Sequence, residues 1–156
     1  MHDGTGCAIG CNFDTTVDAD STQTLIANFA ASAAATGMML RHDTSANQID
    51  LLVGNSSGTL VVNVATPNES IPFNTVGSCV FAFLGQHYQL YLDGNLSLEG
   101  DAVLVPSAGD GQTIGRIGTR GGGLSWYYNG RIGECIGLKG ADGYAAASSL
   151  AAYLAR

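Results

Sequence analysis

Charge is scarce in this sequence, and positive charge most of all. Only 12% of the 156 residues are charged, against about a quarter in an average soluble domain. Six basic residues stand against 13 acidic ones, which gives a formal net charge of −7. Binding to nucleic acid or to an anionic membrane surface requires a basic stripe that attracts phosphate groups. The composition therefore argues against both, and we expect no nucleic-acid partner.

Long apolar runs are also missing. The longest, such as Cys79–Leu84, fall far short of the roughly 20 residues that a spanning helix needs, so we expect no membrane insertion. The first residues, MHDGTGCAIGC, have neither a basic nor a long apolar stretch and do not predict a signal peptide. The hydrophobic fraction of 46% is too high for a disordered chain. We expect residues 1–156 to form a single domain around one core.

The four cysteines match no common zinc-binding spacing. Cys7 and Cys11 are close in sequence, whereas Cys79 and Cys135 stand alone. On one strand, Cys7 and Cys11 would lie about 13 Å apart, which is too far for a disulfide. We interpret all four as buried thiols that serve as small core residues. A redox or metal-binding role is the alternative.

Glycine is abundant, with 22 residues, and it clusters with Asn, Asp and Ser between short apolar runs, which is typical of strands joined by turns. Asp93-Gly94 predicts a type I′ hairpin turn, because both central residues of that turn need a positive φ. Cys79–Leu84 is apolar at every position, which predicts a central strand covered on both faces. Ten strands at this spacing predict a two-sheet sandwich. The predicted strands are Thr5–Phe13, Gln23–Phe29, Gly37–His42, Gln48–Val53, Thr59–Val64, Ser78–Leu84, Tyr88–Asp93, Leu96–Glu99, Gln112–Gly118 and Tyr128–Leu138.

One segment has helical periodicity. Leu150, Tyr153 and Leu154 recur at helical spacing, and alanines, which have the highest helix propensity, fill the positions around them. We predict a short helix within Asp142–Ala155 whose apolar stripe lies on the sandwich. A second alanine-rich segment, Ala30–Ala35, is as consistent with a loop as with one helical turn.

Three motifs in the second half of the chain occur in a familiar order. They are the run Gln89-Leu-Tyr-Leu-Asp-Gly94, the strand Gln112–Gly118, and Tyr127-Tyr-Asn-Gly-Arg-Ile-Gly-Glu134 before the helix. This order resembles the concanavalin A-like, laminin-G-like jelly-roll domain found in bacteriophage virion proteins and bacterial surface proteins. The resemblance implies an all-β, two-sheet antiparallel jelly-roll sandwich with a short C-terminal helix.

The resemblance also predicts an exposed sheet edge. In the family a further strand precedes the segment that Thr5–Phe13 resembles, and it pairs near the strand that corresponds to Gly130–Leu138. Here that strand would be missing, and an unpaired row of backbone N–H and C=O groups would be left. We therefore expect a neighbouring chain to complete this edge, unless the N-terminus has been rebuilt in this lineage.

The function that the resemblance implies is structural or binding rather than enzymatic. It predicts a bacteriophage virion surface protein, either a capsid decoration protein or an accessory fibre domain, whose partners are other virion proteins or copies of itself. The alternative is a lectin-like, carbohydrate-binding adhesin or receptor-binding module, extracellular or at the cell surface, that binds surface glycans. A glycoside hydrolase is a distant third, because we expect none of the three glutamates (Glu69, Glu99 and Glu134) to have the partner carboxylate that this chemistry needs.

The candidate ligand-binding residues are aromatic and polar. Arg120, Trp126 and Tyr127 belong to a glycine-rich stretch, and aromatic faces stack on sugar rings or anchor protein partners. Trp126 is equally consistent with a lid that folds back on the core. His87 and Tyr91 share an outward face of one predicted strand, where they could bind a ligand or be merely solvated.

The only cofactor we weigh is calcium. It prefers six to eight oxygen ligands, and carboxylates cluster in or flank two predicted loops. We nevertheless favour an acidic surface that keeps the protein soluble, with no cofactor, and keep calcium as the alternative. The candidate ligands are Asp14, Asp18 and Asp20 in one loop, and Asp101 and Asp110 beside the other.

Overall fold

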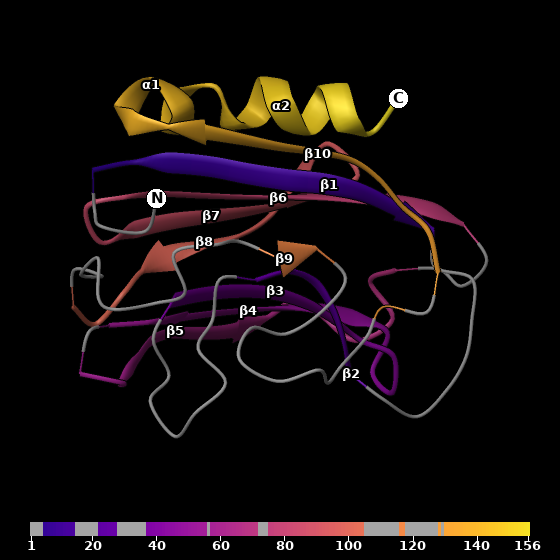
Figure 1. The fold of residues 1–156 in the computed structure, drawn as a ribbon, viewed down its shortest axis with the longest axis horizontal. Helices are drawn as coiled ribbons and strands as arrows, with labels where there is room; N and C mark the ends of the chain where they lie inside the picture. The colour runs from indigo at the N-terminus through magenta and orange to yellow at the C-terminus, as the bar shows by residue number, and fades with distance from the viewer. Residues whose placement is uncertain are drawn as a thin grey trace.

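The chain forms a sandwich of two antiparallel sheets with helices on one outer face (Figure 1). The computed structural model describes residues 5–14, 22–27, 37–55, 57–71, 75–104, 116–117, 128 and 130–156. Within these residues it has ten strands and two short helices, which confirms the predicted all-β sandwich with a C-terminal helix. The segment Ala30–Ala35 and most of the predicted strand Gln112–Gly118 lie outside the described residues.

Sheet A carries the helices. Its strand order is β10-β1-β6-β7-β8, and all its neighbours pair antiparallel. The strands begin and end within a few residues of the predicted positions, because alternating apolar positions and turn residues mark strand bounds well. They are β1 (Cys7–Asp14), β6 (Val76–Leu84), β7 (His87–Leu92), β8 (Asn95–Asp101) and β10 (Ile132–Lys139).

Sheet B lies against the opposite side of the core. Its order is β5-β4-β3-β2-β9, again antiparallel throughout. A register shift between Thr24 and Ile26 interrupts the pairing of β2 with β3. The strands are β2 (Thr22–Ala27), β3 (Gly37–Asp43), β4 (Gln48–Gly54), β5 (Leu60–Ala65) and β9 (Arg116–Ile117).

Alternate side chains of both sheets fill the space between them. Phe81 and Phe83 of β6 are buried there with their ring centroids 5.8 Å apart, and Leu40 and Leu51 meet them from sheet B. Phe13 joins the same cluster from β1. Burying side chains of this size is the main source of stability for such a domain, at roughly 1.5–3 kcal/mol for each one fully buried.

The prediction of a central strand is confirmed for β6. It pairs with β1 on one side and β7 on the other, and its intervening residues Val80 and Ala82 are covered by the helices. The hairpin that follows it turns at Asp93 and Gly94, whose φ angles of 45° and 80° agree with the predicted type I′ turn.

The C-terminal segment forms two helices, α1 (Gly140–Ala145) and α2 (Ala147–Leu154), that cover the outer face of sheet A (Figure 1). Leu150 and Leu154 are buried against it as predicted. Tyr153, the third residue of the predicted stripe, is instead 45% exposed. It lies one residue from Leu154 and so points about 100° away around the helix.

The packing of β1 beside β6 requires a glycine at position 10. A Cβ atom added at Gly10 would lie 2.5 Å from the carbonyl oxygen of Cys79 and 3.1 Å from Cδ1 of Leu154. A larger residue would therefore clash with the backbone of β6 and crowd the Leu154 side chain of α2.

β10 is an edge strand, as the sequence predicts. It pairs with β1, and no other strand among the described residues pairs with it. Whether another chain completes this edge stays a prediction. No helix in the described part of the chain has the length and apolar character to cross a membrane.

Candidate functional site

Polar side chains gather on the outer face of sheet B, the face turned away from the core. Strand alternation places Arg41 and Asp43 of β3 on this face, and the register sets Arg41 opposite Asp50 and Asp43 opposite Gln48. On β5, Asn63 lies opposite an outward-facing leucine of β4. We call Arg41, Asp43, Gln48, Asp50 and Asn63 the sheet B strip.

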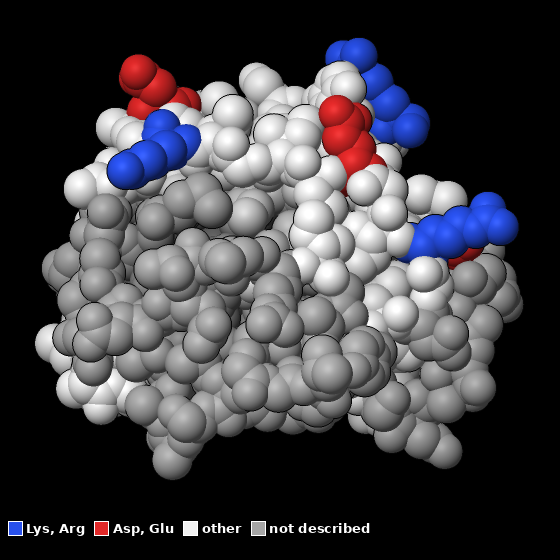
Figure 2. All heavy atoms as spheres, viewed as in Figure 1, with Lys and Arg blue, Asp and Glu red and all other residues white. Residues whose placement is uncertain are grey.

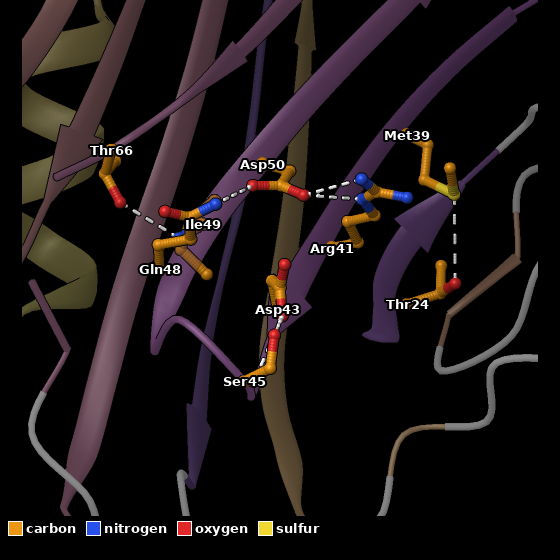
Figure 3. A network of polar contacts seen from close by, with 9 residues as sticks. All are labelled: Thr24, Met39, Arg41, Asp43, Ser45, Gln48, Ile49, Asp50 and Thr66. Carbon is orange, nitrogen blue, oxygen red and sulfur yellow. Dashed lines mark hydrogen bonds and ion pairs between the residues drawn. The ribbon is translucent and has the colours of Figure 1, made fainter. Parts of the chain in front are cut away.

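The centre of the strip is an ion pair held in one geometry (Figure 3). Both Nε and Nη2 of Arg41 lie 2.7 Å from Oδ2 of Asp50. The other carboxylate oxygen, Oδ1, accepts a hydrogen bond of 2.9 Å from Nε2 of Gln48. Guanidinium, carboxylate and amide are thus fixed by one another before any ligand binds. Such charge-assisted hydrogen bonds are stronger than those between neutral groups.

Exposure increases from the middle of the strip to its ends. The side chain of Asp50 is only 6% exposed, whereas that of Arg41 is 22% exposed. Asp43 and Gln48 are half-buried, and Asn63 is exposed. The amide of Gln48 donates through Nε2, and its Oε1 is the acceptor end of the same group.

Asp43 adds a fixed negative charge to the strip. Its Oδ1 accepts hydrogen bonds from the hydroxyl of Ser45 at 2.6 Å and from the backbone N–H of Ser45 at 3.0 Å. These bonds, with the hydroxyl contributing most, lower the pKa of Asp43 below its usual value. At neutral pH the strip therefore presents acceptors beside the donors of Arg41.

Next to the strip the outer face becomes apolar. Ala27, Met39 and Leu52 form a small buried cluster there. The hydroxyl of Thr24 lies 3.8 Å from the sulfur of Met39 (Figure 3). Because these side chains are buried, the part of this face that a ligand can reach is the polar strip itself.

Two predicted ligand-binding residues lie on the other sheet. His87 and Tyr91 share the outer face of β7, as expected from the alternation. Tyr91 is only 8% exposed, because it packs with the apolar face of α2, and its hydroxyl donates to Oε1 of Gln89 at 3.0 Å. Burial raises the pKa of Tyr91 above its usual value. Its contacts in the structure are therefore those of a packing residue.

His87 lies among acidic and aromatic side chains. Its Nδ1 is 3.1 Å from Oδ1 of Asp101, its Nε2 is 3.9 Å from Oε2 of Glu99, and its ring meets that of Tyr144 edge-on at 6.3 Å. Glu99 thus does have a neighbouring carboxylate on the same strand, contrary to our sequence expectation. Both carboxylates are more than half exposed, so the solvent screens this group of charges.

Three other predicted ligand-binding residues, Arg120, Trp126 and Tyr127, lie outside the described residues. The next residue, Tyr128, is described. Its hydroxyl donates to the carbonyl oxygen of Asp14 at 2.7 Å, and its ring meets that of Phe13 edge-on. Burial raises its pKa. Tyr128 therefore supports the core, and the role of Arg120, Trp126 and Tyr127 stays a prediction.

The two described candidates for calcium lie far apart. Asp14 is opposite Val76 at the start of β6, whereas Asp101 is opposite His87, just beyond the other end of that strand. A strand of this length separates them by on the order of 25 Å, so one ion cannot bind both. The described residues contain no group of three His, Cys, Asp or Glu that could hold a metal. Asp18, Asp20 and Asp110 lie outside the described residues.

Asp14 also lines a shallow hollow at the end of sheet A. The hollow has a volume of about 200 Å³ and lies where β1 ends and β6 and β10 begin. Arg131 is the other charged residue in its lining.

Near the helices, charged side chains stand in small groups of both signs, so the described residues on the side shown in Figure 2 form no patch of one sign.

The sequence analysis did not identify the sheet B strip. Its signal was partial: polar and apolar residues alternate through 48–51, whereas 38–43 is three apolar residues followed by three polar ones. That alternation also describes any half-solvated strand. Only the register, which sets Arg41 beside Asp50, distinguishes a fixed polar group from scattered solvated residues.

Several solved structures share the fold of this chain. No protein-family model and no curated protein sequence matches it. The carbohydrate-binding module CBM40 of the Ruminococcus gnavus IT-sialidase superposes with a TM-score of 0.72 at 16% identity, covering 93% of this chain and 83% of the module. Domain 4 of AbnA, an extracellular GH43 arabinanase from Geobacillus stearothermophilus, gives 0.67 at 13% identity, covering 99% of this chain and 68% of that chain.

The chain has the β-sandwich fold of these carbohydrate-binding domains. The CBM40 domain was also solved with α2,3-sialyllactose bound, and domain 4 of AbnA with arabinotriose. A leech intramolecular trans-sialidase contains the same fold at a TM-score of 0.70 and 15% identity, covering 95% of this chain and 24% of that protein. At these identities the likeness establishes the fold alone.

Proposed function

We propose that this chain is a non-catalytic carbohydrate-binding module that acts outside the cell or at its surface. The observation that carries the proposal is the fixed arrangement of Arg41, Asp50 and Gln48 on the outer face of sheet B. Sugar hydroxyls both donate and accept hydrogen bonds, and this group offers both kinds of partner in fixed positions.

The fold supports the same proposal. Both CBM40 and domain 4 of AbnA bind oligosaccharides in their solved structures. The comparisons contain nothing that supports the virion role or its virion partners, so the glycan-binding alternative is the function we carry forward. Because these two structural neighbours bind different oligosaccharides, the fold alone does not identify the ligand of this chain.

Isothermal titration with arabinotriose, α2,3-sialyllactose and lactose, preceded by a glycan array, tests the proposal. We expect saturable binding of at least one glycan. Gln48→Ala removes one amide and frees Oδ1 of Asp50 from its partner. Losing hydrogen bonds of this kind costs about 1–3 kcal/mol, so we expect the affinity to fall roughly five- to hundredfold.

Gln86→Ala is the matched control. Gln86 is an exposed glutamine of the β6–β7 turn, where its Nε2 donates to the carbonyl oxygen of Ala102, so its loss is expected to leave binding unchanged. Silence across the array would refute the proposed function. Binding that survives Gln48→Ala but is lost in Trp126→Ala would instead place the site in the stretch around Trp126.

A further inference from the structure

Three of the four cysteines lie in one row across sheet A. Cys11 of β1 is directly opposite Cys135 of β10 on one side and directly opposite Cys79 of β6 on the other. Directly opposite residues project to the same face of a sheet, and here that is the core face. Residues more than 50 positions apart in the sequence thus become neighbours, with Cys11 in the middle.

The thiols of this row are in direct contact. Cys11 is hydrogen-bonded to both Cys135 and Cys79. Its bond with Cys135 lowers the pKa of Cys11, but its bond with Cys79 and its burial outweigh this and raise that pKa well above the usual value. The bond with Cys11, followed by burial, raises the pKa of Cys135. In this structure all three are thiols.

The three thiols differ in how a reagent reaches them. Cys11 is 0% exposed and Cys79 is 1% exposed, whereas Cys135 is half-buried and lies on the edge strand. β10 is paired on one side among the described strands, but β6 is held between β1 and β7. Cys135 is therefore both the most accessible thiol and the one whose backbone has most room to adjust.

We propose that Cys11 and Cys135 are a modification site, a thiol pair that a peroxide or a disulfide oxidant converts to a disulfide joining β1 to β10. Opposite residues of antiparallel strands have Cα atoms about 4.5 or 5.5 Å apart, and both values lie in the range that disulfides adopt. Their Cβ atoms need only a small approach, which an edge strand allows.

The reaction with a peroxide balances in two steps. The thiol of Cys135 gives up its proton and its thiolate attacks the peroxide; the O–O bond breaks, a sulfenic acid forms, and the proton joins the leaving hydroxide as one water. Because the pKa of Cys135 is raised, this step is slow at neutral pH and faster at higher pH. The sulfur of Cys11 then displaces the hydroxyl from this sulfenic acid, which leaves as a second water. The two thiols lose two electrons and two protons in total, and hydrogen peroxide is reduced to two molecules of water.

The other pairings are less suited. A bond between Cys11 and Cys79 would join two interior strands around atoms that the oxidant cannot reach without opening the core. Cys7 lies opposite Phe83 and Lys139 rather than a cysteine, about 13 Å along the strand from Cys11. The geometry therefore selects one pair out of four cysteines.

Peptide mapping of the oxidised native protein tests this proposal. The protein is treated with hydrogen peroxide, remaining thiols are blocked, and the chain is cut with trypsin without reduction. The peptide Ile132–Lys139 contains Cys135 as its single cysteine, Met1–Arg41 contains Cys7 and Cys11, and His42–Arg116 contains Cys79. We expect mass spectrometry to find Ile132–Lys139 linked to Met1–Arg41 in most molecules.

Single variants assign the link. Cys7→Ala and Cys79→Ala are expected to keep it, and Cys11→Ala to abolish it. A cross-link of Ile132–Lys139 to His42–Arg116 in the wild type would overturn the proposal. So would a Cys135 that stays blocked as a thiol, or that is oxidised only to sulfinic acid while Cys11 remains a thiol.

Discussion

At the scale of single residues, His42 shows how burial makes stability depend on pH. It is 2% exposed, and burial lowers its pKa, although the hydrogen bond with Asn47 and the charges of Asp43 and Asp50 oppose the shift. Its Nε2 lies 3.1 Å from Oδ1 of Asn47, so Nε2 carries the proton and donates. Protonating the second ring nitrogen would place a charge among buried side chains.

The first prediction concerns this histidine. Its pKa in the folded chain lies below the unfolded value of about 6.5, so the unfolded chain takes up a proton first as the pH falls. The stability that the neutral His42 contributes to the folded state is complete above pH of about 6.5 and is lost progressively below that value. We expect the free energy of unfolding, measured with urea, to fall between pH 7 and pH 5, and to fall less in His42→Gln. Equal losses in both proteins would exclude His42 as the cause.

Residue chemistry was visible in the sequence, but residue partners were not. The alternation correctly placed His87 and Tyr91 on one face of β7. It did not show that α2 would cover Tyr91, or that Arg41 would meet Asp50 across β3 and β4. Burial and partners depend on neighbours distant in the chain, and a local pattern does not contain them.

At the scale of elements, the strands and helices were largely predictable because each depends on local signals. Apart from β9, most of whose predicted range lies outside the described residues, the strands fall close to their predicted bounds, and Asp93-Gly94 turns as its residue types require. The exception is the face of the C-terminal helix. The sequence grouped Tyr153 with Leu150 and Leu154, whereas the docking of α2 on β1 and β6 buries only the two leucines of the three.

The second prediction separates the two neighbours on α2. Leu154 is 3% exposed and packs on sheet A, so Leu154→Ala should lower the free energy of unfolding by about 2–4 kcal/mol. Tyr153 is 45% exposed, and its contacts are a 3.3 Å hydrogen bond to Glu134 and Arg156 over its ring. We expect Tyr153→Ala to cost less than about 1 kcal/mol. Urea unfolding of both variants measures these two changes in the free energy of unfolding. Changes of similar size would mean that α2 packs on sheet A in an orientation rotated about its own axis.

At the scale of the whole molecule, what the sequence could not supply is pairing between distant strands. The sandwich follows from the number and spacing of strands, but the register of β10 on β1 is non-local. That register turns Cys11 and Cys135 from separate core thiols, as we interpreted them, into adjacent ones. The same holds for the sheet B strip, because Arg41 meets Asp50 and Asp43 meets Gln48 only in the register that β3 and β4 adopt.

The last prediction follows from the span that a Cys11–Cys135 disulfide would close, which is most of the chain. Cross-linking residues this far apart restricts the unfolded chain strongly, by about 5 kcal/mol in the chain-entropy model. Strain at the edge strand would subtract from this gain. For a domain of this size we expect the oxidised protein to melt on the order of 10 °C above the reduced one.

Calorimetry of peroxide-treated wild type, with and without added reductant, measures this difference, and Cys11→Ala treated in the same way is the control. The control should melt at one temperature under both conditions, because its Cys135 has no thiol opposite. The sheet B strip lies on the other sheet and faces away from the core, so glycan affinity should be the same in both redox states. A linked protein that melts no higher than the reduced form would mean that strain in β10 cancels the entropic gain.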